Sequence, residues 1–204
     1  MEFIGAKTLE TNRLALKVPT MKEQYDLWQI LKQENINKWY MPTPERFHGD
    51  REAFQKSLND WEKQEKYYQM KIDMLNENSN MFTWSIFIKD GPVIGQITVQ
   101  PQSYSPNCPE IRDIGWFIAP DYQGKGYAYE AAEVILKYMF YEVEIEEIKT
   151  SAAEINKSSW NLMEKLGFER LGEDVSTYKD ENGEFLPSFT YILTRDKYLN
   201  KRKR

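Results

Sequence analysis

Short segments in which apolar and polar residues alternate predict β-strands along much of the chain. Residues 13–18 place Leu14, Leu16 and Val18 on one face. The aromatic-rich segment 82–88 is followed by the turn sequence Lys-Asp-Gly-Pro and a second alternating run, which indicates a β-hairpin. The predicted strands cover residues 13–18, 82–88, 93–99, 111–120, 145–152 and 189–194.

Apolar residues spaced three or four positions apart predict helices between these strands. The first helix begins at Pro19-Thr20 and continues to Leu31. The longest spans 50–75, where Glu65 alone interrupts a stripe formed by Phe54, Leu58, Trp61, Tyr68, Ile72 and Leu75. Two later helices cover 127–142 and 156–166, and Gly167 provides a C-cap for the second. Loops are expected at 41–50, 76–80 and 101–110, and a turn at 180–183.

The order of the elements is strand, two helices, three strands, helix, strand, helix, strand. This order indicates an α/β fold, in which a mixed sheet carries helices on its faces. Neither a repeat nor a linker interrupts it, so we expect one domain over residues 1–204. The basic residues 201–204 are expected to form a solvated, disordered tail.

Composition narrows the class of protein. A hydrophobic content of 41% supports a sizeable core, and the net charge of −5 argues against nonspecific binding to nucleic acid. Apolar runs fall far short of the ~20 residues that span a bilayer, and no signal peptide is evident, so we expect no membrane partner. A single cysteine, Cys108, favours a cytoplasmic location. With His48 the only histidine, neither a zinc site nor a Cys/His nucleophile pair is expected, and both residues are interpreted as inert.

A glycine-rich turn at 121–128 (Asp-Tyr-Gln-Gly-Lys-Gly-Tyr-Ala) lies between a strand and a helix. Its glycines allow the backbone to approach a ligand, and the helix N-terminus offers free N–H groups to a phosphate. An unliganded tight turn is the alternative. The spacing excludes a Walker loop, because no Ser or Thr follows Lys125, and it excludes GxGxxG, because Tyr129 stands at the third glycine.

The segment Gln123–Ala128 matches the acetyl-CoA signature [RQ]xxGx[GA] of the GNAT superfamily at Gln123, Gly126 and Ala128. The surrounding IGWFIAPDYQGKGYAYEAAEVILKYMF, the later NKSSWNLMEKLGF and the early TNRLALKVPT also resemble this family, with a leaning toward ribosomal-protein N-terminal acetyltransferases. The resemblance implies a mostly antiparallel central sheet flanked by helices, and acetyl-CoA without a metal. It also implies direct transfer of acetyl to a small amine or a peptide N-terminus, by a monomer or homodimer.

The same resemblance assigns cofactor contacts. Backbone groups of Phe117 and Ile118 would bond the pantetheine arm, and Asn156 would contact it, unless Asn156 is only a helix N-cap. Lys125 would bind a phosphate or remain solvated. The N–H groups expected to hold the pyrophosphate belong to Gln123, Gly124, Lys125, Gly126, Tyr127 and Ala128.

Catalytic roles follow from the same comparison. Asp113, on the opposite face of its strand from Ile114, would be the general base, with Glu110 as a second candidate and a solvent-facing aspartate as the alternative. Ser159 would lie near the cofactor sulfur. Many relatives carry a tyrosine acid where this chain has Met163, so Ser159 or water would protonate the leaving thiolate. Leu186-Pro187-Ser188 also departs from the family pattern and leaves acceptor recognition open.

Two competing interpretations remain. The chain could be a catalytically silent acyl-CoA-binding module that acts as a sensor or scaffold through the 50–75 helix. It could also be an unrelated nucleotide-binding domain, which would bind ATP or NAD instead of CoA.

Overall fold

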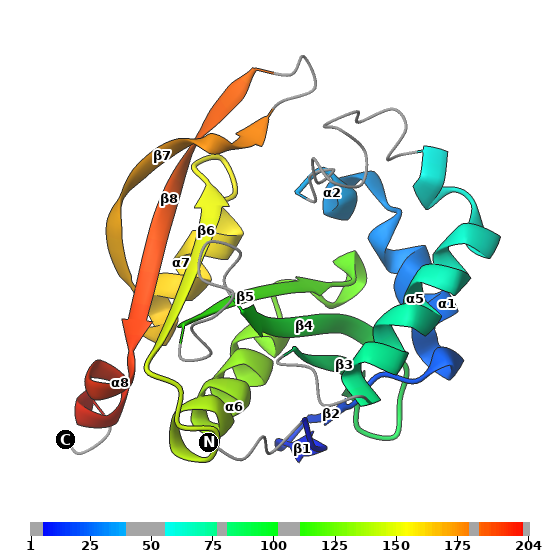
Figure 1. Cartoon of the computed structure of the whole chain (residues 1–204), viewed down its shortest axis with the longest axis horizontal. Coiled ribbons are helices and arrows are strands. Elements are labelled where there is room, and N and C mark those ends of the chain that lie inside the picture. Colours follow the sequence, from blue (N-terminus) through cyan, green and yellow to red (C-terminus); the bar gives the residue numbers. More distant parts are fainter. Residues whose placement is uncertain (1–5, 40–55, 77–80, 102–110, 180–183, 202–204) are drawn as a thin grey trace.

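The computed structural model describes residues 6–39, 56–76, 81–101, 111–179 and 184–201. Within these ranges the strands form one sheet in the order β1-β2-β3-β4-β5-β6-β8-β7 (Figure 1). The strands are β1 Leu9–Glu10, β2 Leu14–Lys17, β3 Phe82–Ile88, β4 Val93–Pro101, β5 Ile111–Ile118, β6 Glu147–Ala153, β7 Glu169–Lys179 and β8 Phe185–Thr194. The helices are α1 Met21–Leu31, α2 Glu34–Asn37, α5 Trp61–Asn76, α6 Tyr127–Tyr141, α7 Lys157–Leu166 and α8 Arg195–Lys201. This architecture confirms the predicted fold class.

The pairing of β5 with β6 is the parallel one in an otherwise antiparallel sheet. It covers only Ile111–Asp113 against Glu147–Lys149. On its other edge β5 stays paired with β4 as far as Ile118. Beyond Asp113, therefore, β5 and β6 run apart, as Figure 1 shows, and one edge of β5 is left open.

Helices cover both faces of the sheet. The main core lies between the sheet and α6, where Ile114 and Ile118 of β5 pack in the same cluster as Ile135 and Met139. A smaller cluster on the other face joins Leu27 of α1 to Phe117. Side chains alternate along a strand, so Asp113 and Gly115 share the α1 face with Phe117. This confirms the prediction that Asp113 and Ile114 lie on opposite faces of their strand.

Local sequence explains where several elements begin and end. Thr20 and Glu23 form a capping box at the start of α1. Gly167 ends α7 in the left-handed region at φ 101°, and the N–H of Phe168 donates to the Met163 carbonyl at 3.0 Å, which confirms the predicted C-cap.

The predicted uninterrupted helix over 50–75 is wrong at Asn59 and Asp60. The Asp60 carboxylate accepts a hydrogen bond from the Lys63 N–H at 3.3 Å, and the Asp60 carbonyl accepts one from Gln64 at 3.1 Å, so a new helix begins there. The part of the prediction over 50–55 lies outside the described residues.

Strands β1 and β7 and helices α2 and α8 were not predicted from the sequence. β7 is an edge strand with a polar sequence and two register irregularities against β8, so it lacks the alternation by which strands were recognised. Lys201, assigned to the disordered tail, is the last residue of α8. Residues 202–204, the loop at 102–110, the turn at 180–183, His48 and Cys108 lie outside the described residues.

Gly95 of β4 lies very close to the main chain of β5, and this contact can be tested by substitution. A Cβ atom added there would lie 2.2 Å from the Phe117 carbonyl oxygen. Gly95→Ala should therefore lower the free energy of unfolding by about 1–3 kcal/mol in urea denaturation. Gly115→Ala is the matched control in the neighbouring strand, because a Cβ there would meet nothing within 4 Å. Equal stability of the two variants would contradict this account of the β4–β5 contact.

Candidate active site

Three neighbouring cavities, which share some lining residues, surround the fork between β5 and β6. The first, the loop cavity, has a volume of about 410 Å³ and lies beside the glycine-rich turn and the N-terminal ends of α6 and α7. All of the predicted cofactor contacts except Lys125 line it, namely Phe117, Ile118, Gln123, Gly124, Gly126, Tyr127, Ala128 and Asn156.

The glycine-rich turn holds its backbone in a conformation suited to an anion. Gly124 and Gly126 have φ of 70° and 81°, in the left-handed region that favours glycine. The Glu130 N–H donates to the Gly126 carbonyl at 3.1 Å, which closes the first turn of α6. The preceding N–H groups have no partner within the helix and lie at the positive end of its dipole. The Gln123 side chain donates to the Ile118 carbonyl at 2.9 Å, which holds the turn against the end of β5.

The N–H and C=O groups along β5 point alternately toward β4 and toward the gap that separates β5 from β6. The Ala119 N–H donates to Ile94 of β4 at 2.7 Å, whereas the Ile114 carbonyl accepts from the Thr150 hydroxyl at 2.8 Å. Main-chain polar groups of consecutive residues face opposite sides of a strand, and those of residues two apart face the same side. Trp116 and Ile118 therefore present their N–H groups to the gap, and Phe117 presents its own to β4. The geometry favours Trp116 and Ile118 as main-chain partners of a ligand, with Phe117 as part of the cavity wall.

Asn156 lines the loop cavity, whereas Lys125 does not. The Lys125 ammonium donates to the Asp121 carbonyl at 2.8 Å and is not part of the cavity wall. Asn156 occupies the N-cap position of α7 without making a side-chain cap. Its Oδ1 accepts from the Ser158 hydroxyl at 3.0 Å, and its Nδ2 has no partner among the described residues. The amide N–H₂ of Asn156 is therefore available to a ligand.

The second cavity, the helix cavity, has a volume of about 480 Å³ and lies between α1, α5 and strands β3 to β5. Leu27, Leu58 and Ile72 are among its apolar walls, and Tyr67 and Tyr68 add aromatic surface. Its polar lining consists of the alternating strand positions Thr83, Gln96, Thr98, Gln100 and Asp113, together with the helical residues Gln24, Gln64 and Lys71. The sequence interpretation did not single out the Thr and Gln residues, although their alternation with buried residues was visible.

A smaller cavity of about 190 Å³, the fork cavity, lies next to the other two. It shares Asp113 and Gly115 with the helix cavity, and Asn156 and Ser159 with the loop cavity. Asp113 of β5 and Ser159 of α7 thus line one small space at the fork, the position at which molecules in the two larger cavities would meet.

Asp113 is half-buried at this junction. Burial raises the pKa of its carboxyl to about 6, and hydrogen bonding with the Ile114 N–H and Gln100 opposes the rise. A carboxylate with this pKa is mostly ionised at neutral pH and still binds a proton more readily than an ordinary aspartate, as a general base requires. The second base candidate, Glu110, lies outside the described residues.

Ser159 and Met163 face the fork cavity from α7. The Ser159 N–H donates to the Asn156 carbonyl at 3.0 Å, while its hydroxyl has no partner among the described residues. Met163 is buried and has no proton to donate. Among the residues described by the structure, Ser159 is therefore the better placed of the two to act as a proton donor.

Two further observations concern the described residues alone. No group of three or more His, Cys, Asp or Glu side chains among them is arranged to hold a metal ion. None of their helices combines the length and apolar character needed to cross a membrane.

Comparison with known proteins identifies relatives of the whole fold. Residues 13–169 match the model of the acetyltransferase (GNAT) domain. The chain is 27% identical over 165 residues to the uncharacterized N-acetyltransferase YnaD of Bacillus subtilis (strain 168), across 80% of this chain and 84% of that protein. Ribosomal-protein-S5-alanine acetyltransferase from Vibrio fischeri shares the fold with a TM-score of 0.75 at 15% identity, over 95% of this chain and 99% of that one. Microcin C7 self-immunity acetyltransferase MccE, solved with acetyl-CoA and AMP, does so with a TM-score of 0.70 at 16% identity, over 90% and 93%.

The raised pKa of Asp113 has a consequence for stability. Because the folded carboxyl binds its proton more tightly than the unfolded one, the free energy of unfolding should fall as pH rises from about 3.8 to about 6. Asp113→Asn removes the free-energy cost of a buried carboxylate. The melting temperature of this variant should therefore exceed that of the parent at pH 7.5 and match it below pH 4. Thermal unfolding across this pH range measures the difference. A difference that does not change with pH would contradict the assigned pKa.

Proposed function

The chain belongs to the acetyltransferase (GNAT) family, and from this premise we propose that it transfers the acetyl group of acetyl-CoA directly to a primary amine. The acceptor is a small molecule or a peptide N-terminus. The observation that carries the proposal is the fork cavity, which is lined both by Asp113, a residue of the helix cavity, and by Ser159, a residue of the loop cavity.

The loop cavity is proposed to hold acetyl-CoA, which supplies a thioester as the acyl donor. The N–H groups from Gly124 to Ala128 would bind the diphosphate. The Gln123 N–H, which the sequence also assigned to the diphosphate, instead donates to the Pro120 carbonyl at 3.1 Å. Trp116 and Ile118 would hydrogen-bond the pantetheine arm along the open edge of β5, and Asn156 would donate to it from the opposite side. The structure of MccE in complex with acetyl-CoA, at 16% identity, supports acetyl-CoA as a ligand of this fold.

Asp113 is proposed to remove the proton that blocks attack. An amine with a pKa near ~10 is almost wholly protonated at pH 7. Once Asp113 accepts that proton, the amine nitrogen forms a bond to the acetyl carbon and the carbon–sulfur bond breaks. The acylated nitrogen must then lose a second proton to become an amide, and that proton passes through Ser159 or water to the leaving thiolate, because Met163 cannot donate one.

The helix cavity is proposed to hold the acceptor. Its volume of about 480 Å³ lies within the ~300–1,000 Å³ typical of small-molecule sites. Its apolar walls and its stripe of Thr and Gln side chains suit an acceptor that has both apolar and hydrogen-bonding groups. A peptide N-terminus is the second candidate, favoured by the shared fold with ribosomal-protein-S5-alanine acetyltransferase.

A catalytically silent acyl-CoA-binding module is the alternative function, and Met163 at the usual tyrosine position is the observation that favours it. Calorimetric titration with acetyl-CoA, with ATP and NAD as controls, tests cofactor binding. A free-thiol assay over amines and peptides then tests turnover. We expect micromolar binding of acetyl-CoA alone, followed by thiol release. Binding without release would support the silent module, and the absence of acetyl-CoA binding would refute the proposal.

The assignment of Asp113 as base gives a pH dependence. The active form is deprotonated, so kcat/KM, which reports the ionisation of the free enzyme, should fall below an apparent pKa of about 6. Asp113→Asn should lower kcat by about 10²–10⁴ and flatten this acidic limb, with little effect on the Kd of acetyl-CoA. Asp196→Asn, an exposed aspartate of α8, is the control and should behave like the parent. Retention of the acidic limb in Asp113→Asn would show that another group is the base.

A further inference from the structure

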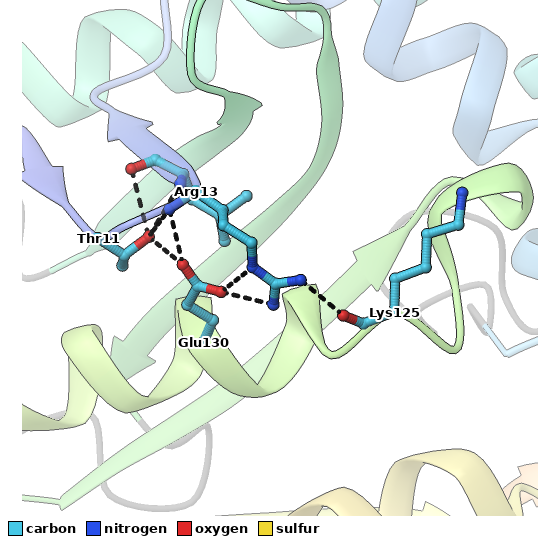
Figure 2. A network of polar contacts seen from close by, with 5 residues as sticks. Thr11, Arg13, Lys125 and Glu130 are labelled. Carbon is cyan, nitrogen blue, oxygen red and sulfur yellow. Dashed lines mark hydrogen bonds and ion pairs between the residues drawn. The ribbon is translucent and has the colours of Figure 1, made fainter.

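Arg13, immediately before β2, connects the beginning of the sheet with the glycine-rich turn far along the chain (Figure 2). Its Nη1 donates to the Lys125 carbonyl at 3.0 Å, and its Nε donates to Glu130 Oε2 at 2.7 Å. The Arg13 main-chain N–H donates to Glu130 Oε1 at 3.0 Å, and the Thr11 hydroxyl donates to the same oxygen. The guanidinium also lies 4.5 Å from the centre of the Tyr127 ring.

We propose that Arg13 is a positioning residue for the diphosphate-binding turn. It acts through the Lys125 carbonyl and the Glu130 carboxylate without touching the cofactor. The inference rests on the proposed function, because it presupposes that the loop cavity receives the diphosphate of acetyl-CoA.

Arg13 orients the peptide group between Lys125 and Gly126. The described chain contains no cis peptide bond. In a trans peptide the carbonyl and the following N–H point in opposite directions. Because the Lys125 carbonyl is held by Arg13, the Gly126 N–H points away from Arg13. Gly126 lines the loop cavity and Arg13 does not. Arg13 therefore fixes the orientation in which the Gly126 N–H is available to a ligand.

Arg13 also neutralises the negative charge of Glu130. Glu130 lies in the first turn of α6, where a bare carboxylate would repel an anion bound at the helix N-terminus. Burial tends to raise the pKa of Glu130, but hydrogen bonds from Thr11 and Arg13 outweigh it and lower that pKa, so the carboxylate is ionised. The Arg13 guanidinium neutralises this charge. A lysine in its place would have a single ammonium instead of the planar fork that reaches both Lys125 and Glu130.

The kinetic test compares acetyl-CoA with S-acetylpantetheine, which carries the same thioester but no diphosphate. For Arg13→Met we expect the KM for acetyl-CoA to rise about tenfold to a hundredfold, with kcat within about twofold of the parent. Both constants for S-acetylpantetheine should be unchanged. Arg13→Lys, which restores the charge without the fork, should fall between Arg13→Met and the parent.

Two controls separate positioning from other roles. Lys89→Met removes an exposed ion pair with Glu10 near the same strands and should leave every constant unchanged. The double variant Arg13→Met/Glu130→Gln removes both charges and should retain the raised KM for acetyl-CoA, because the Lys125 carbonyl stays unheld. Recovery of the parent KM would mean that charge balance alone matters, which would overturn the positioning role.

Other outcomes also overturn the inference. Equal losses with both thioesters, together with a lowered melting temperature, would mean that Arg13 serves only to hold β2 against α6. An unchanged KM for acetyl-CoA in Arg13→Met would likewise refute it while leaving the proposed function intact. A parent protein that fails to bind acetyl-CoA would instead refute the proposed function itself.

Discussion

The short parallel pairing of β5 with β6 is the constraint on which the candidate site depends. The two strands are hydrogen-bonded only from Ile111 to Asp113, and the Thr150 side chain bonds the Ile114 carbonyl where they begin to separate. Backbone polar groups are costly to leave unpaired in a protein interior. An extended ligand with amide groups could therefore hydrogen-bond to the N–H groups of Trp116 and Ile118 along the open edge of β5.

The same fork explains why Asp113 is both useful and costly. It is the last residue of β5 in the parallel ladder, so it lies where the fork cavity meets the helix cavity. Its burial raises the pKa of the carboxyl toward the range that a general base needs, and the ionised form is destabilised for the same reason. In the proposed mechanism, the ionised carboxylate that serves activity would also lower stability, a trade-off common where function needs a destabilised group.

The parts of the site that sequence alone could predict depend on local patterns. The glycine-rich turn, the start of α6 and the face of β5 occupied by Asp113 all follow from spacing and alternation within a few residues. Other features depend on tertiary structure. Which edge of β5 opens depends on its partners, so Trp116 could not be preferred to Phe117 from the sequence. The pairing of Arg13 with Glu130 crosses most of the fold, and the break at Asn59 and Asp60 required hydrogen bonds that an apolar stripe does not show.

Amide hydrogen exchange with and without CoA tests the central claim most directly, because it reports on the open edge of β5 residue by residue. We expect CoA to slow exchange at Trp116 and Ile118 and across Gly124–Ala128, while Phe117, already facing β4, changes little. Protection of the glycine-rich turn without protection of Trp116 and Ile118 would contradict the role assigned to the fork. The absence of protection at both places would contradict the assignment of the loop cavity as a whole.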